Sequence, residues 1–493
     1  MRRRVLPIAL LVLLALPAAA CGDKTSSNVA RGGSTPAGAS MVRAGVVAFV
    51  SVDSDLGSSQ WQQLDELSQK FPGRDKALAR LQAEFSKNGV DWKSDVEPAL
   101  GPELDVAVVS AGTAATTEAV ALTKPDDAAK LKALVAKLNA RDPSGSKVVY
   151  REVNGWYALS DSEVGIASAL KGDQTPLADD ASFTEAMKKL PGETIVKAYV
   201  DGQQLNQLVS KASARSGSGL GAASLGLDTL KYLSVSLSAE DDGLRARGAS
   251  SGGSFGSSDF TSQLIGGVPE NALALLDFSG KGTAGQLDKL LSSQQFAAAV
   301  QELKEYLGIT PDELTALLGG ELAFYVRPSA LIPEFTLALD PQDKSAALST
   351  LDKLAAHLAA MTGGRVESGM QNGHEVKTVD LGQFAIHYGS GGNGKIVITT
   401  GPNGVADYGA GSSLTDSADF KEAKDAAGMP DSTGDVVYLD IKNLVPLLES
   451  VASLAGGDLP QDVVENLQPL RSLLAWSEGE GDSRTFDAFL EIK

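Results

Sequence analysis

The chain repeats itself, and this repetition limits what it can fold into more than any other feature. Two stretches of roughly 200 residues carry the same kinds of segment in the same order, with sequence offsets that drift from about 216 to 240 residues. Such self-similarity indicates one structural unit used twice. At 493 residues the chain is long enough for two domains. We therefore expect an internally duplicated fold.

Six landmarks define the duplication. In order along the chain, the matching segments of the first and second halves are 46–52 with 272–278, 99–104 with 317–322, 124–129 with 340–345, 182–183 with 419–420, 196–201 with 436–440, and 230–236 with 470–476. The segments that close a strand end in Asp201 and Asp440, and a helix is expected after each. In both halves Asp follows Pro, in Pro125-Asp126 and in Pro341-Gln342-Asp343, which is typical of helix starts.

The hydrophobic pattern within each half predicts the fold class. Strand-like segments such as 485–492 alternate between apolar and polar residues, which indicates sheets that are mostly antiparallel. Leucines recur at helical spacing in 131–138 and again in 348–358, which predicts amphipathic helices. We expect an α+β fold in which mostly antiparallel sheets carry amphipathic helices on one face.

The N-terminal residues have the pattern of a lipoprotein export signal. Arg2 to Arg4 precede an apolar run from Val5 to Leu16, and three alanines lead to Cys21. The run is short for a membrane span, and Cys21 is the only cysteine, so it has no disulfide partner in the chain. We predict a signal peptide over 1–20, cleavage before Cys21, and attachment of diacylglyceryl to its thiol. The protein would then be lipid-anchored at the outer face of the cell membrane.

The remaining boundaries follow from composition. Residues 21–42 contain the lipidated cysteine and a tether rich in Ser, Thr, Gly and Ala, and 249–267 form a Ser/Gly linker. The first α+β repeat is expected over 43–248 and the second over 268–493.

The charge of the chain argues against nucleic acid as a partner. The formal net charge is −19, and cleavage of a signal with three arginines and no acid would take it to about −22. Nucleic-acid binding needs basic patches instead. The sequence also lacks a phosphate loop, a dinucleotide fingerprint and a CxxC pair, so no cofactor is expected.

Catalytic and metal-binding candidates are weak. Ser254 lies in a pattern that resembles a nucleophile elbow, but the pattern falls within the Ser/Gly linker, where composition alone produces it. His374 and His387 flank a predicted hairpin and do not supply the three or four ligands that a metal needs. We predict neither a catalytic residue nor a metal site.

Two similar turns have a structural interpretation. Gly101 and Glu103 in the first half match Gly319 and Glu321 in the second, each just before a strand. Glycine permits the turn, and glutamate can accept hydrogen bonds from nearby backbone N–H groups. Because the pair occurs in both halves, we expect a structural role.

The chain resembles a bacterial family of exported proteins and lipoproteins, frequent in actinobacteria, that is known only as a domain of unknown function. The segments that carry the resemblance are 50–53, 70–72, 95–103, 318–321 and 438–440. The resemblance covers nearly all of residues 43–493 and implies a shared fold and location, without an activity or a site.

These observations favour a protein that is not an enzyme. The first hypothesis is a lipid-anchored binding or scaffold protein of the cell envelope, with an envelope protein or a lipid as its partner. The alternatives are a carrier of a lipid or another apolar envelope molecule, and a hydrolase built around Ser254.

Overall fold

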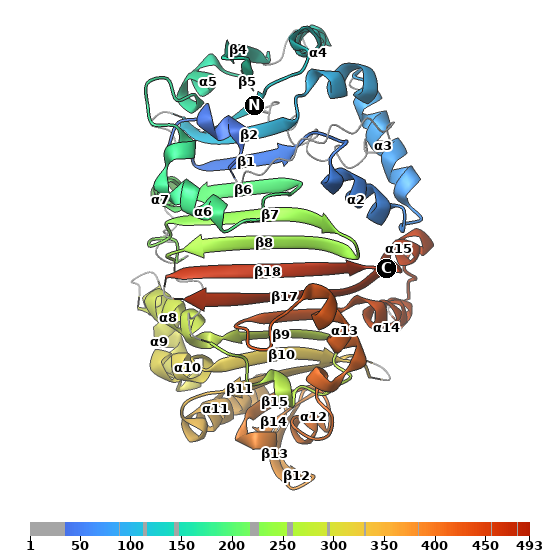
Figure 1. Ribbon diagram of the computed structural model, residues 1–493. Coiled ribbons are helices and arrows are strands. Elements are labelled where there is room, and N and C mark those ends of the chain that lie inside the picture. Colours follow the sequence, from blue (N-terminus) through green and yellow to red (C-terminus); the bar gives the residue numbers. More distant parts are fainter. Residues whose placement is uncertain are drawn as a thin grey trace. The chain divides into compact units, whose positions relative to one another are not determined.

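The computed structural model describes residues 35–493 apart from 88, 112–115, 142–146, 217–225, 254–259, 293–295, 330–331, 383, 455 and 481. Contacts divide the described chain into two compact units, the first formed mainly by residues 35–253 and the second mainly by residues 260–493. We refer to them as unit 1 and unit 2. Both consist of an antiparallel sheet with helices, so the expected α+β class is confirmed (Figure 1).

Unit 1 contains an antiparallel sheet in which the strands pair in the order β4–β5–β3–β2–β1–β6–β7–β8. Its strands are β1 (Ala48–Asp53), β2 (Glu103–Ala111), β3 (Thr116–Thr123), β4 (Val149–Val153), β5 (Trp156–Ser160), β6 (Val196–Asp201), β7 (Tyr232–Glu240) and β8 (Gly243–Ser251). Its α-helices are α2 (Ser59–Ser68), α3 (Arg74–Lys87), α4 (Ala128–Arg141), α5 (Glu163–Ala169), α6 (Ala181–Lys188) and α7 (Gly202–Ser216). Shorter helical segments are η1 (Ala37–Ser40), η2 (Trp92–Val96), η3 (Glu97–Ala99) and η4 (Leu177–Asp179).

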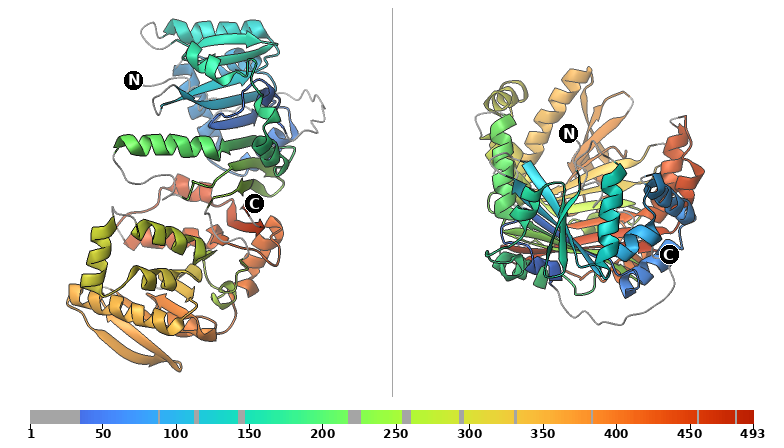
Figure 2. Two further views of the ribbon diagram at one scale, coloured as in Figure 1. Left: turned by 90° about the vertical axis from the view of Figure 1, so that its left-hand side faces the viewer. Right: turned by 90° about the horizontal axis from the view of Figure 1, so that it is seen from above.

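Unit 2 repeats this strand order and adds one hairpin. Its pairing is β14–β15–β11–β10–β9–β16–β17, with β12 and β13 added beyond β14, and β18 drawn beside β17 (Figure 1). The strands are β9 (Ala274–Ser279), β10 (Glu321–Arg327), β11 (Glu334–Asp340), β12 (Val366–Gln371), β13 (His374–Asp380), β14 (Ala385–Ser390), β15 (Ile396–Thr399), β16 (Val436–Asp440), β17 (Leu470–Glu480) and β18 (Ser483–Ile492). In the left view of Figure 2 the added hairpin (orange) projects from the rest of unit 2 alongside a helix, α11.

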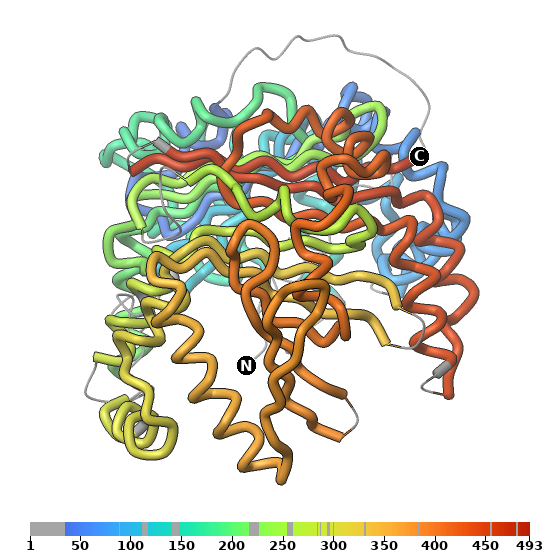
Figure 3. Tube along the Cα trace, turned by 90° about the horizontal axis from the view of Figure 1, so that it is seen from below, coloured from blue at the N-terminus to red at the C-terminus, as the bar shows by residue number. Residues whose placement is uncertain are grey.

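Most helices of unit 2 lie at the ends of its strands, whereas those at 404–407 and 418–427 pack against the sheet. The α-helices are α8 (Gly280–Leu291), α9 (Ala297–Glu302), α10 (Pro311–Leu318), α11 (Lys344–Thr362), α12 (Gly404–Asp407), α13 (Ala418–Ala427), α14 (Ile441–Leu454) and α15 (Gln461–Leu467). Shorter helical segments are η6 (Ile265–Gly267), η8 (Leu303–Leu307), η9 (Gly392–Gly394) and η10 (Leu414–Asp416). Figures 1 and 3 show α8 to α11 at one end of the strands and α14 and α15 at the other. A capping residue explains where α11 begins: the Asp343 side chain accepts a hydrogen bond from Ala346 N at 2.9 Å.

Each unit has its own apolar core. In unit 1 the helices α5 and α6 cover the sheet, and Phe183 packs edge to face on Tyr199 with ring centres 5.0 Å apart. In unit 2 the equivalent Phe420 packs on Tyr438 at the same 5.0 Å. The duplication therefore extends from the strand order to individual ring contacts.

Both predicted linker boundaries need correction. Residues 37–42 belong to the core of unit 1, because Ala39 and Val42 have no exposed surface. At the other boundary, residues 249–251 belong to β8, and Leu264 is buried in the core of unit 2. The small residues that suggested a tether serve close packing: a Cβ on Gly38 would lie 1.8 Å from Asp105 Oδ2. Residues 21–34 of the predicted tether, including Cys21, lie outside the described residues.

Within the described part of the chain, none of the helices combines the length and the apolar character that crossing a bilayer requires.

Candidate functional site

The predicted turn residues fix the segment that enters each unit. Glu103 accepts hydrogen bonds from Gly38 N at 2.8 Å and Ala37 N at 3.2 Å. Glu321 accepts from Gln263 N and Leu264 N, both at 2.6 Å. Each glutamate thus holds a backbone segment 57 to 66 residues earlier in the chain, instead of the local N–H groups that the sequence suggested.

The glycines of these turns are required by close backbone contacts. A Cβ on Gly101 would lie 1.8 Å from the carbonyl oxygen of Lys124. In unit 2 the corresponding position is Gly320, where an added Cβ would lie 2.0 Å from Asp340 O, while Gly319 ends α10. Non-bonded atoms cannot approach so closely, so these positions accept only glycine without a backbone shift.

A buried aspartate accompanies each glutamate, and sequence reasoning missed both. Asp105 and Asp277 have no exposed surface. Both oxygens of Asp105 and Oδ1 of Asp277 have no hydrogen-bond partner, while Asp277 Oδ2 accepts from Ser262. Burial, reinforced by Glu103, raises the pKa of Asp105 well above its usual value. Burial and the nearby Glu321 raise the pKa of Asp277 to about 8.

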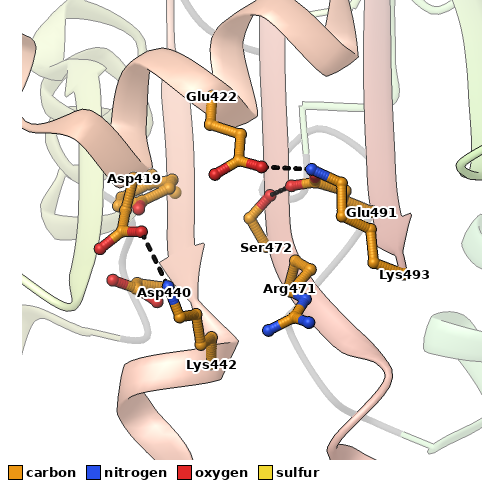
Figure 4. A pocket seen from close by; sticks show the side chains of 9 residues that line it. Asp419, Glu422, Asp440, Lys442, Arg471, Ser472, Glu491 and Lys493 are labelled. Carbon is orange, nitrogen blue, oxygen red and sulfur yellow. Dashed lines mark hydrogen bonds and ion pairs between the residues drawn. The ribbon is translucent and has the colours of Figure 1, made fainter.

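Unit 2 contains a polar cavity at the end of β16 and β17, with a volume of about 230 Å³ (Figure 4). It is lined by Asp419, Glu422, Tyr438, Asp440, Lys442, Arg471, Ser472, Glu491 and Lys493. They come from α13, β16, β17, β18 and the first turn of α14, together with Lys493 directly after β18. Sequence reasoning identified none of them as a site.

Most charges in this cavity are neutralised by neighbours. Ser472 Oγ donates to Glu491 at 2.8 Å, and Lys493 Nζ lies 2.8 Å from the other oxygen of that carboxylate. Lys493 also donates to Glu422, and these contacts raise the pKa of Lys493 to about 12. Lys442 Nζ lies 3.3 Å from Asp419. Figure 4 draws the interactions on the two sides of the cavity as dashed lines.

Two opposite charges have no ionic partner among the described residues. The Nε atom of Arg471 is buried and has no hydrogen-bond partner. Asp440 is 5% exposed and accepts from the backbone N of Asn443 at 3.0 Å and from its Nδ2 at 2.8 Å, but from no cation. Burial raises the pKa of this carboxyl, while the Asn443 hydrogen bonds lower it. The cavity thus contains a half-buried arginine whose Nε has no acceptor and a buried carboxyl with no cation in direct contact, although Lys442 is close enough to favour the charged form of that carboxyl.

Unit 1 fills the equivalent position with an aromatic ring. Tyr232 lies opposite Asp201 in the β6–β7 register, as Ser472 lies opposite Asp440 in the β16–β17 register. The Tyr232 hydroxyl is 3.2 Å from Glu185. At this register position unit 2 therefore has a small serine that lines the cavity, and unit 1 has a buried tyrosine.

Other residues considered from sequence do not join the cavity. Cys21 and Ser254 lie outside the described residues. His374 Nδ1 contacts Ser390 O at 2.9 Å, and His387 Nδ1 contacts Thr378 Oγ1 at 2.9 Å. Burial lowers the pKa of His387. Over the described ranges, no group of three or more His, Cys, Asp or Glu side chains could hold a metal ion.

The strand order and the ring contacts define a duplicated α+β protein, and the polar cavity lies in its second copy. The chain belongs to the family described as Protein of unknown function (DUF3352), whose model matches residues 166–492. The expected membership of a family of unknown function is confirmed.

Comparisons with individual proteins add little. None of the curated proteins matches the chain. A solved structure of TP0453, in crystal form IV, aligns over 48% of this chain and 94% of its own at 11% identity. Its TM-score of 0.22 is too low for the likeness to carry an argument.

Proposed function

We propose that the protein is a lipid-anchored, extracytoplasmic binding protein without catalytic activity, and that unit 2 holds a small polar ligand in the cavity between α13 and the ends of β16 and β17. The export signal ending at Cys21 supports the location. The ligand would occupy the cavity shown in Figure 4.

The observation that carries this proposal is the unpaired charge inside the cavity. Leaving a buried charged group without a partner costs free energy, and proteins rarely retain such groups without a compensating contact. Arg471 Nε and Asp440 both lack an ionic partner. A bound ligand that contacts both would remove the cost, which is why we place the binding site here.

The comparison between the two units gives independent support. The same fold is stable in unit 1 with Tyr232 at the position of Ser472. The fold itself therefore does not require a small residue at this position. In unit 2 the serine also donates to the buried Glu491, and a ligand beside it would account for the space that remains.

Native mass spectrometry of the chain purified from its own envelope tests the proposal. We expect a small molecule to accompany the protein and to be lost in Ser472→Tyr, which places in unit 2 the side chain that unit 1 already accommodates. Ser450→Tyr makes the same chemical change at an exposed position of α14 and serves as the control. A bare protein mass for the unaltered chain, or a ligand that persists equally in Ser472→Tyr, would contradict the proposal.

A second candidate function, the carrier of an apolar molecule, is favoured by one observation in unit 2. Leu276, Phe324 and Phe335 lie on one face of the sheet and are 38% to 43% exposed. Phe324 and Phe335 stack with ring centres 6.3 Å apart. On α14, Leu448 and Val451 are also exposed. Exposed apolar patches commonly mark binding surfaces.

The two candidates give different mass spectra. A carrier would retain a co-purified lipid in Ser472→Tyr and lose it in Phe324→Ser, whereas the cavity proposal predicts the opposite dependence on these two variants. Lipid extraction identifies the bound molecule in either case.

A further inference from the structure

The cavity also indicates the chemical class of its ligand, an inference that rests on the binding function proposed above. We infer that the cavity of unit 2 recognises a small zwitterion with the head group of an amino acid, in which Arg471 binds the carboxylate and Asp440 binds the ammonium group.

Arg471 is the residue expected to bind the carboxylate of the ligand. A guanidinium presents several N–H donors in a planar fork that matches a carboxylate. The Nε donor of Arg471 is buried in the lining without an acceptor. A more highly charged anion such as phosphate is disfavoured, because Asp419, Glu422, Asp440 and Glu491 line the same cavity.

Asp440 is the residue expected to bind the ammonium group of the ligand. Each carboxylate oxygen can accept two hydrogen bonds, and Asn443 donates one to each oxygen of Asp440. Acceptor capacity therefore remains on both oxygens. The nearest lysine of the following helix, Lys442, contacts Asp419 instead. An ammonium group of a ligand would supply the missing positive charge.

The other acidic side chains of the cavity already contact a hydroxyl or a lysine, so Arg471 and Asp440 are the charged groups left to recognise a ligand. Glu491 contacts both Ser472 and Lys493, and Glu422 contacts Lys493. A ligand with one positive and one negative group leaves the total charge of the cavity unchanged. A lone anion or a lone cation would satisfy one of the two unpaired groups and leave the other.

The volume limits the size of the ligand. Pockets for drug-sized molecules are typically about 300–1,000 Å³. The cavity, at about 230 Å³, is smaller and suits a molecule with a few carbon atoms beyond its head group.

Isothermal titration calorimetry on the purified full chain tests the inference with three probes of similar size: alanine, propionate and n-propylamine. The inference predicts one alanine site per chain, with propionate and n-propylamine each about 10- to 100-fold weaker, since each lacks one charge-assisted hydrogen-bonding group. We expect Arg471→Gln to weaken alanine about 10- to 100-fold. Ser472→Tyr should abolish binding, and Ser450→Tyr should leave it unchanged.

Asp440 also caps the first turn of α14, so a substitution there could affect folding as well as binding. The thermal midpoint of Asp440→Asn is therefore measured beside its affinity for alanine. The amide keeps the size of the side chain, and the inference predicts weaker alanine binding with a folded, cooperative melting transition.

Results that overturn the zwitterion assignment differ from results that overturn the proposed binding function. Propionate binding as tightly as alanine would overturn the zwitterion assignment and leave an anion-binding cavity. A co-purified molecule that lacks an ammonium or a carboxylate group, yet disappears in Ser472→Tyr, would likewise overturn the assignment while the proposed function stands. A bare mass from the native envelope, with no heat from any probe, would overturn both.

Discussion

Replacement of Asp277 by asparagine should change how the stability of unit 2 depends on pH. The pKa of Asp277 is raised from 3.8 to about 8, chiefly by burial. Between these values the folded protein keeps a proton that the unfolded chain releases. The stabilising contribution is therefore complete below pH 4 and is lost as the pH rises towards 8.

The magnitude follows from proton linkage. A group that is protonated only in the folded state changes stability by about 1.4 kcal/mol per pH unit. Between pH 5 and 7, Asp277 should lower the unfolding free energy of unit 2 by about 3 kcal/mol. In Asp277→Asn this loss disappears, although burial also raises the pKa of Glu321, so the profile becomes flatter without becoming flat.

Hydrogen exchange of peptides from β9 and β10, measured across a denaturant series at pH 5, 6 and 7, reports the stability of unit 2. Asp288→Asn changes an exposed aspartate of α8 and is the control. The reasoning is refuted if Asp277→Asn and the unaltered chain lose the same stability between pH 5 and 7.

Four further predictions concern the fold and the anchor. Phe420→Leu removes the ring contact with Tyr438 and should lower the unfolding free energy of unit 2 by about 1–3 kcal/mol in denaturant titrations; an unchanged midpoint would contradict this. Glu321→Gln weakens the hydrogen bonds that hold residues 263–264, so limited proteolysis should cut there faster, and an unchanged rate would count against the assigned role. Gly101→Ala places a methyl group against a backbone carbonyl and should lower the thermal midpoint, whereas the control Gly192→Ala, with open space around its Cβ, should not. Cys21→Ser should move the protein from the membrane fraction to the soluble fraction of the envelope; continued sedimentation with membranes would exclude the lipid anchor.

Features encoded locally were predictable from the sequence. Strands that end in Asp201 and Asp440 and the helices after them follow from short apolar runs and capping residues. The repeated order of these segments predicted a duplicated α+β fold because each segment keeps its hydrophobic pattern in both halves.

Features that depend on distant partners were not predictable. Glu321 binds N–H groups of residues 263 and 264, which sequence distance hides. The small residues near Gly38 looked like a tether, although their size permits contact with Asp105. The composition of a segment does not distinguish flexibility from close packing.

The cavity was hidden for the same reason. Ser472 and Glu491 are unremarkable as single residues, and only the strand register brings them together. Asp440 appeared as the end of a strand, and its burial and unpaired charge emerge only in the folded unit. The difference between Ser472 and Tyr232 was visible in the aligned halves and would have been the available signal.

A crystal structure of the chain purified from its own envelope, without added ligand, tests the central claim most directly. The account predicts electron density for a small molecule that bridges Arg471 and Asp440, and its absence in crystals of Ser472→Tyr. A cavity that contains only water, with Arg471 paired to one of the neighbouring carboxylates, would contradict it.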